Sequence, residues 1–203
     1  MAKRAAPSPE QRLSAQESFE DETFEGVDAH EVDLGHKEFY RCTFRNAKLQ
    51  ETRWARTRLE DCVFEACDLT RALPAQLALR TVEFKHCKLM GIDWSNLATY
   101  PDVAFNECNL RYASFVSTQL RKTRFVQCTL LEANFLQVEL AEAVFEACQF
   151  SGARFENCDL RGANFARSVD LFVDPSKNRV QGMIIPSESA LLLAASFGMK
   201  IEG

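Results

Sequence analysis

Cysteine is the residue type with the most chemistry to offer in this sequence, since 8 cysteines occur among 203 residues. Thiolates bind metals, form disulfides and act as nucleophiles where their surroundings lower the thiol pKa. No C-x-x-C pair and no H-E-x-x-H motif is present, and His30, His36 and His86 stand apart from any serine or cysteine arrangement. We therefore expect no catalytic residue, no metal site and no cofactor, in a protein that is not an enzyme.

The spacing of the cysteines belongs to a wider repeat. Cys62 and Cys67 are five residues apart, and an apolar residue recurs at the same spacing from Phe19 to Trp94, large except at Ala29 and interrupted once by Pro74. After a slip of one residue, every fifth position is again Phe or Leu up to residue 165. The phenylalanines of this second block are Phe105, Phe115, Phe125, Phe135, Phe145, Phe150, Phe155 and Phe165.

A period of five fits neither a helix nor a flat strand. Five steps of about 100° put successive members on different faces of a helix, and odd steps alternate faces in a strand. The period fits a chain that turns a corner every five residues, so that each segment points its central residue inward. The sequence therefore predicts an all-β solenoid with four sides and about 20 residues per coil. Its interior holds the apolar residues that recur every five positions, which we call the ladder.

The cysteines lie two residues before ladder positions, where the other residues are small or slender. Cysteine is small and readily buried, so it suits a narrow interior. Stacking the coils places one column of cysteines within bridging distance of one another, but parallel side chains and a reducing compartment favour free thiols. This column comprises Cys67, Cys87, Cys108, Cys128 and Cys148.

Composition excludes several classes of protein. With 8 glycines the chain is too glycine-poor for folds built on glycine-rich phosphate loops, and a net charge of −5 argues against direct nucleic-acid binding. No apolar run approaches the roughly 18 residues that span a bilayer, so no membrane association is expected. The first 16 residues lack the apolar core of a signal peptide, which favours a cytoplasmic location.

These patterns divide the chain into three parts. Residues 1–16 are polar and rich in Ala, Pro, Ser and Gln, which predicts a disordered tail. Residues 17–169 form the solenoid, with irregularities near 71–76 and 95–102, where the extra residue must bulge outward. Residues 170–203 form a capping and dimerisation segment.

The third part covers the open end of the coils. We expect a helix with Ser187 as N-cap and Gly198 as its stop, followed by a short strand from Met199 to Ile201. A helix that is apolar nearly all round predicts a two-fold partner. The candidate dimer contacts are Leu191, Leu192, Phe197, Met199 and Ile201.

Short motifs carry a family resemblance. The units Cys158-Asp-Leu-Arg-Gly162, Ala163-Asn-Phe-Ala-Arg167 and Cys67-Asp-Leu-Thr-Arg71 resemble the A(D/N)LXX pattern of pentapeptide-repeat proteins. The resemblance implies a right-handed quadrilateral β-helix with phenylalanine and leucine centres inside, followed here by a short C-terminal helix and strand.

A narrower similarity points to one branch of that family. Residues 89–94, 108–115 and the ending from Ala190 to Gly203 are similar to the topoisomerase-protecting branch, which includes Qnr-type proteins and the self-resistance proteins of albicidin and microcin B17 producers. This similarity implies a cytoplasmic homodimer that binds DNA gyrase, and often topoisomerase IV, and relieves a poison such as a fluoroquinolone.

Two docking modes fit that function. In DNA mimicry, carboxylates stand where phosphates would lie, with Glu132, Glu139, Glu142 and Glu146 as candidates, although basic stretches such as residues 41–58 and 111–124 interrupt the acidity. In loop docking, the bulge presents exposed anchors, with Leu97, Tyr100 and Asp102 as candidates. An ordinary solvated surface, a tolerated bulge, and a scaffolding protein with an unrelated partner remain as alternatives.

Overall fold

The backbone turns a corner every five residues, and its dihedral angles mark each corner. Asn46, Asp61 and Thr81 occupy corners with φ of 52°, 53° and 52°. Residues other than glycine enter this left-handed region at a cost of about 1–2 kcal/mol. A hydrogen bond to the next coil helps to hold the corner, as when the Asn46 N–H donates to the Glu65 carbonyl at 2.9 Å. Most corners therefore need no glycine, which explains how a glycine-poor chain makes so many turns.

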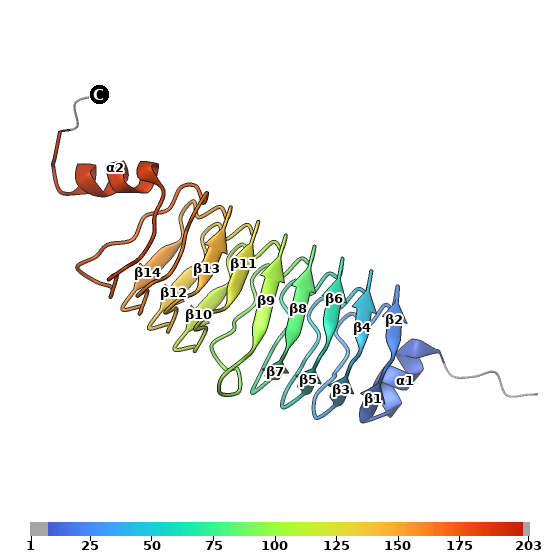
Figure 1. Ribbon diagram of the computed structural model, residues 1–203. Coiled ribbons are helices and arrows are strands. Elements are labelled where there is room, and N and C mark those ends of the chain that lie inside the picture. The colour runs from blue at the N-terminus through green and yellow to red at the C-terminus, as the bar shows by residue number, and fades with distance from the viewer. Residues whose placement is uncertain (1–7, 201–203) are drawn as a thin grey trace, which may run out of the picture.

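Four such corners close one coil, and the coils stack in parallel register. The computed structural model describes residues 8–200, whose coils form a parallel β-solenoid along one rod axis (Figure 1). Phe24 lies opposite Phe44, and Phe44 opposite Phe64, at the 20-residue offset that the ladder predicts. The expected four-sided all-β solenoid is confirmed. Its longest sheet has 7 strands, β2 (Thr23–Glu25), β4 (Thr43–Arg45), β6 (Val63–Glu65), β8 (Val82–Lys85), β9 (Val103–Asn106), β11 (Arg124–Val126) and β13 (Val144–Glu146).

Two shorter sheets divide the rod at the irregular loop. A 4-stranded sheet ends where the loop of residues 95–102 begins, and a 3-stranded sheet on another side starts after it. One side of the solenoid therefore has regular strands only before this loop and another side only after it, while the 7-stranded sheet continues past it. The first sheet comprises β1 (Ser18–Glu20), β3 (Glu38–Tyr40), β5 (Arg58–Glu60) and β7 (Ala78–Arg80), and the second comprises β10 (Ser114–Val116), β12 (Asn134–Leu136) and β14 (Arg154–Glu156).

Stacked aromatic rings fill the interior. Phe125 and Phe145 stack with centroids 4.7 Å apart and an interplanar angle of 9°, close to the spacing of neighbouring strands. Burial of each such side chain contributes about 1.5–3 kcal/mol. The expected ladder phenylalanines are all buried, namely Phe105, Phe115, Phe125, Phe135, Phe145, Phe155 and Phe165.

Both irregularities fall where the ladder breaks. Pro74 is buried at a ladder position between Trp54 and Trp94, and the three line a residual void of about 10 Å³. The two large indoles thus compensate for the small proline. At the second irregularity, β8 and β9 pair Phe84 with Phe105, so the extra residue is accommodated in the loop.

The N-terminal coil is covered by a helix, so the expectation of disorder over residues 1–16 is wrong for its second half. Helix α1 (Pro9–Ala15) begins with a capping box in which Ser8 and Gln11 satisfy each other's backbone N–H groups. Leu13 is fully buried against the first coil, which pays for ordering the helix. Residues 1–7 lie outside the described part of the chain.

The solenoid extends beyond the expected boundary at residue 169. Parallel bridges join Asp159 to Arg179 and Asn164 to Ile184, so another coil follows. In this coil Asn178 takes the place that Cys158 has one coil earlier, and it donates to the Phe155 carbonyl at 2.9 Å. The five-residue pattern is hidden here because Asp170 occupies a ladder position and is exposed.

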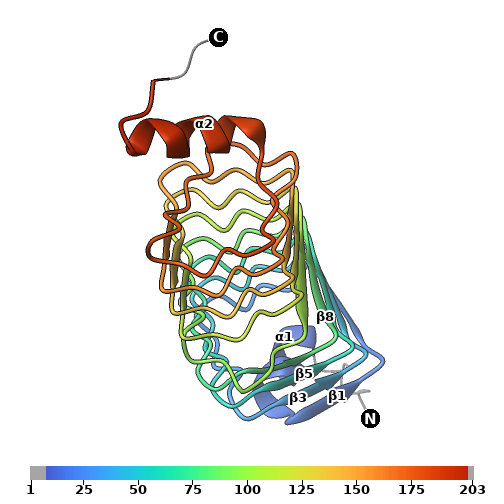
Figure 2. The same ribbon diagram turned by 60° about the vertical axis from the view of Figure 1, so that its left-hand side comes forward.

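Helix α2 (Ser187–Ser196) follows this last coil and lies beyond it, to one side of the rod (Figure 2). Pro186, not Ser187, is the N-cap, and no side chain caps the helix, so that detail of the prediction is wrong. Gly198 has φ of 76° directly after the helix, as expected of its stop. The strand expected from Met199 is not formed at residues 199–200, and Ile201 lies outside the described residues.

Candidate partner-binding site

The cysteine side chains are packed inside the solenoid. The Cys108 thiol donates to the carbonyl of Phe84 in the preceding coil at 3.3 Å, and other cysteines repeat this contact. Burial raises the pKa of the Cys158 thiol, which suppresses the reactive thiolate. All the cysteines are buried free thiols, and residues 8–200 contain no cluster of His, Cys, Asp and Glu suited to a metal ion.

The loop of residues 95–102 is the main departure from the regular surface, and Figure 1 shows it dropping away from the rod between β7 and β10. Its backbone hydrogen bonds within residues 8–200 join it to the preceding coil. The Ala98 N–H donates to the Leu77 carbonyl at 2.9 Å, and the Asp102 N–H donates to the Leu79 carbonyl at 3.0 Å. These bonds fix the loop as an ordered projection.

The three loop residues expected to contact a partner have different environments. Tyr100 is 78% exposed and takes a left-handed φ of 57°, so its ring is free to serve as an anchor. Leu97 is half-buried and packs against the core, so the expectation that it is an exposed anchor is wrong. Asp102 is exposed, and Thr81 lies 3.5 Å from its carboxylate.

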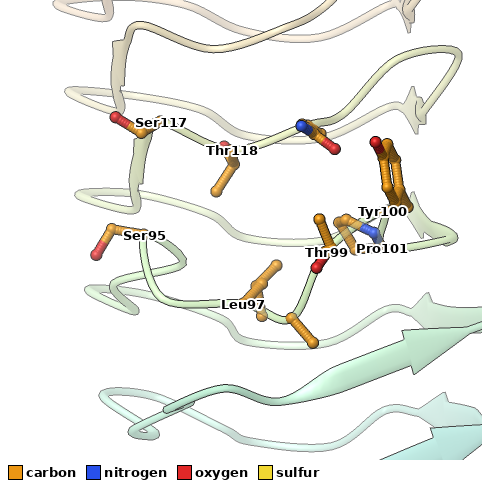
Figure 3. A pocket seen from close by; sticks show the side chains of 9 residues that line it. Ser95, Leu97, Thr99, Tyr100, Pro101, Ser117 and Thr118 are labelled. Atoms are coloured by element: carbon orange, nitrogen blue, oxygen red, sulfur yellow. The ribbon is translucent and has the colours of Figure 1, made fainter.

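A hollow opens between the loop and the following coil. Loop residues 95 and 97–101 line one wall, residues 117–119 line the other, and the cavity volume is about 140 Å³. Figure 3 shows the Thr118 side chain pointing towards the loop, with Tyr100 upright at one end. Thr118 and Gln119 were not among the sequence candidates. The 20-residue register could have found them, since they lie one coil beyond the bulge.

Charges on the N-terminal half alternate in sign along columns. Arg45 lies between Glu25 and Glu65, at 3.8 and 2.7 Å. In a neighbouring column Lys48 pairs with Asp28 at 3.1 Å, and Lys88 with Asp68 at 3.4 Å. Such exposed pairs contribute little to stability, but they neutralise the surface. This half of the rod does not present a continuous row of carboxylates.

The four acidic candidates divide into two pairs. Glu132 and Glu139 are exposed and have no ion-pair partner among the described residues. Glu142 forms ion pairs with Arg121 and Lys122, and Glu146 pairs with Arg167. The Arg121 guanidinium, as the largest influence, lowers the pKa of Glu142. Half of the expected acidic patch is therefore already neutralised within the chain.

Helix α2 and the residues directly after it carry exposed apolar side chains. Leu191, Leu192, Phe197 and Met199 are all exposed, at 51%, 46%, 58% and 61%. They include every described member of the expected dimer contacts. No helix within residues 8–200 combines the length and the hydropathy needed to cross a membrane.

The repeat also matches a known family. The family model described as the pentapeptide repeat region matches residues 37–115 and 98–169. The chain belongs to the pentapeptide-repeat family. The resemblance seen in its motifs is thereby confirmed, and each pentapeptide corresponds to one side of the solenoid. The comparison with curated proteins found no match.

Solved pentapeptide-repeat structures share this architecture. A trypsin-treated variant of QnrB1, a plasmid-mediated fluoroquinolone resistance protein, is 21% identical over 91% of this chain and 97% of its own, with a TM-score of 0.51. HetL, involved in heterocyst differentiation regulation in the cyanobacterium Nostoc sp. strain PCC 7120, is 20% identical over 84% of each chain, also with a TM-score of 0.51. At these identities the likeness establishes the pentapeptide-repeat fold.

Proposed function

We propose that this pentapeptide-repeat protein is a non-enzymatic, cytoplasmic partner of a type II topoisomerase, DNA gyrase above all, that protects the enzyme from a poison. The observation that carries the proposal is the ordered loop of residues 95–102, which presents an exposed tyrosine beside a polar hollow on an otherwise regular rod. Similarity to the fold of QnrB1, a fluoroquinolone resistance protein, supports the choice of partner.

Loop docking is favoured over mimicry of DNA along the whole rod. A DNA mimic needs rows of unpaired carboxylates, because a basic partner can bind these without first displacing cations of the mimic's own chain. Here Glu142 and Glu146 are held by cations of this chain, and the N-terminal columns alternate in sign. The unpaired Glu139, one coil beyond the hollow residue Gln119, supplies local attraction on the loop side of the rod.

A supercoiling assay tests this function with a matched pair of tyrosines. DNA gyrase is inhibited by a fluoroquinolone and then supplied with the wild-type protein, Tyr100→Ala or Tyr112→Ala. Tyr112 is 53% exposed but lies away from the loop, so it controls for loss of a surface aromatic ring. We expect wild type and Tyr112→Ala to restore supercoiling, and Tyr100→Ala to require at least about tenfold more protein.

Two results would contradict the proposal. Absence of both rescue and inhibition by micromolar wild-type protein would remove gyrase as the partner. Equal rescue by Tyr100→Ala and the wild type would remove the loop as the docking site, and charge reversal at Glu132 and Glu139 would then test the mimicry mode.

The protein is proposed to act as a homodimer joined through α2. Four apolar side chains exposed on one short segment form a patch of the kind that marks interaction sites. Leu192→Asp should give a monomer in sedimentation analysis, whereas Leu73→Asp, at a residue 55% exposed on the solenoid, should leave the dimer intact. A wild-type monomer at tens of micromolar protein would exclude this arrangement.

A regulatory scaffold with an unrelated protein partner is the second candidate. HetL, which takes part in the regulation of differentiation, shares the fold at the same TM-score as the QnrB1 variant, so the fold does not choose between the two. The gyrase assay separates them, because a scaffold of this kind would neither rescue nor inhibit supercoiling.

A further inference from the structure

The hollow beside the loop exists because the contacts between neighbouring coils are interrupted there. A parallel bridge joins Leu77 to Leu97 below the loop, and another joins Gln119 to Glu139 above it. Among the described residues no such bridge joins Leu97 to Gln119. The inserted residue therefore separates two coils along one side of the rod.

Thr118 loses its hydrogen bond at this break. Its counterparts in other coils, such as Thr57 and Ser168, donate to a carbonyl of the preceding coil at 2.6 and 2.9 Å. In the same register the Trp94 carbonyl would accept the hydrogen bond of Thr118. The chain leaves the regular path directly after Trp94. Thr118 Oγ1 is left without a partner although the residue is only 5% exposed. A buried polar atom without a partner costs about 1–3 kcal/mol, so a ligand that pairs with this hydroxyl recovers that cost.

A second buried oxygen without a partner belongs to the next residue, Gln119. Gln119 Oε1 is buried and accepts no hydrogen bond, and Gln119 lines the hollow beside Thr118. The volume of about 140 Å³ is several times the roughly 10–15 Å³ that one water requires. The hollow therefore has room for the end of a polar side chain, and a turn of the Thr118 and Gln119 side chains would bring both oxygens to its surface.

The surrounding charges select a cation. The lining contains neither Lys, Arg nor His, and Glu139 stands one coil beyond Gln119 without an ion-pair partner among residues 8–200. Tyr100 adds an exposed aromatic ring at one end of the hollow (Figure 3). A guanidinium group has five donors in a plane and stacks on aromatic rings, whereas an ammonium is compact and strongly hydrated. The combination of two acceptors, a flat ring and a free carboxylate suits arginine.

We propose that the hollow between residues 95–101 and 117–119 is a pocket for an arginine side chain of the protein partner. Thr118 Oγ1 and Gln119 Oε1 accept its N–H groups, the ring of Tyr100 lies against its plane, and Glu139 attracts its charge. The inference rests on the part of the proposed function that places a protein partner at the loop, but it does not require that partner to be a topoisomerase.

The pocket can be tested with a small probe and the intact chain. N-acetylarginine amide is titrated into the 15N-labelled protein and followed by amide chemical shifts. We expect saturable shifts confined to residues 97–101 and 117–119, and at least tenfold weaker binding of N-acetylcitrulline amide, which keeps the shape but lacks the charge. Nα-acetyl-lysine amide, whose side-chain ammonium is free, should also bind at least tenfold more weakly, because it lacks the planar guanidinium group.

Matched variants assign the contacts. Thr118→Val removes the unpartnered hydroxyl at constant shape and breaks no hydrogen bond, so the fold should persist while arginine binding weakens about tenfold. Tyr100→Ala should weaken binding similarly, and Tyr112→Ala should leave it unchanged. Absence of saturable shifts in the wild type, or equal binding of arginine and either comparison compound, would overturn the inference.

The outcome is separable from the gyrase assay. Gyrase protection without arginine binding would overturn the pocket alone. Arginine binding without gyrase rescue would overturn the choice of partner alone and leave the pocket assigned.

Discussion

The rings of Phe84 and Phe105 stack directly on each other, with centroids 5.5 Å apart, although one residue more than the regular repeat separates them. The neighbouring pairs Phe64–Phe84 and Phe105–Phe125 stack at 4.9 Å. The interior column thus continues past the insertion with only a slight widening. The extra residue is absorbed entirely on one side of the rod, where it creates the loop and the hollow.

The loop should be dispensable for folding. Deleting Thr99 returns the local spacing to the regular repeat, and Phe84 and Phe105 are already in register without the loop's help. We expect the deletion variant to keep the circular dichroism of the solenoid and to lose gyrase protection and arginine binding. Loss of the β spectrum would show instead that the loop is needed to set the register.

A ladder residue should control stability where its outward neighbour does not. Phe125 is fully buried between Phe105 and Phe145, so Phe125→Ala should lower the free energy of unfolding by about 3–5 kcal/mol. Gln127 is an exposed corner residue with φ of 52°, and Gln127→Asp should change it by less than about 0.5 kcal/mol. Urea unfolding of the two variants measures the difference, and equal stabilities would refute the inward assignment.

Two buried threonines should respond in opposite ways to the same substitution. Thr57 Oγ1 donates to the Leu34 carbonyl at 2.6 Å, so Thr57→Val leaves a buried carbonyl short of a donor and should cost about 1–3 kcal/mol. Thr118 Oγ1 has no partner, so Thr118→Val should leave stability unchanged or raise it. Urea midpoints of the two variants measure both effects. A loss at Thr118 as large as that at Thr57 would show that water already satisfies its hydroxyl.

Acid should destabilise the rod through its surface carboxylates. Hydrogen bonds from Arg41 lower the pKa of Asp21, and hydrogen bonds from Arg121 lower the pKa of Glu142. A carboxyl whose pKa is lower in the folded state stabilises the fold above its unfolded-state pKa of about 4, and this stability is lost as pH falls through the folded value. We expect the urea midpoint to be level near neutral pH and to fall below about pH 4.

A pair of arginines controls for this acid effect. Arg41→Gln should reduce the acid-dependent part of the stability, because it removes the hydrogen bonds to Asp21. Arg53→Gln removes an exposed arginine that has no ion pair among the described residues, so its pH profile should match that of the wild type. Identical profiles for both variants would assign the acid sensitivity to other groups.

Local spacing was enough to predict the interior but not the ends. Every fifth residue identified Phe105 to Phe165 as buried, because a five-residue turn leaves one inward centre per side. The same reading missed helix α1, since its amphipathic signal is a single buried residue, Leu13, in a polar segment. It also ended the solenoid too early, because the last coil replaces the cysteine with Asn178 and exposes Asp170.

The candidate site shows the same division. The one-residue slip in the ladder placed the bulge and its Tyr100 correctly on the surface. It could not show that Leu97 turns inward to the core, because an irregular loop has no period from which to assign a face. Nor could it show which acids are neutralised, since Glu142 meets Arg121 only when neighbouring coils are stacked.

The sequence alone determined the pentapeptide-repeat solenoid, its buried thiols and the position of its insertion, because these follow from spacing along the chain. Only the tertiary structure decided which side of the rod opens at the insertion, and that Thr118 and Gln119 keep oxygens without partners there. The physical reason is that hydrogen bonds and ion pairs between coils join residues about 20 positions apart. Their loss at one place depends on how two coils separate in space, which no local pattern records.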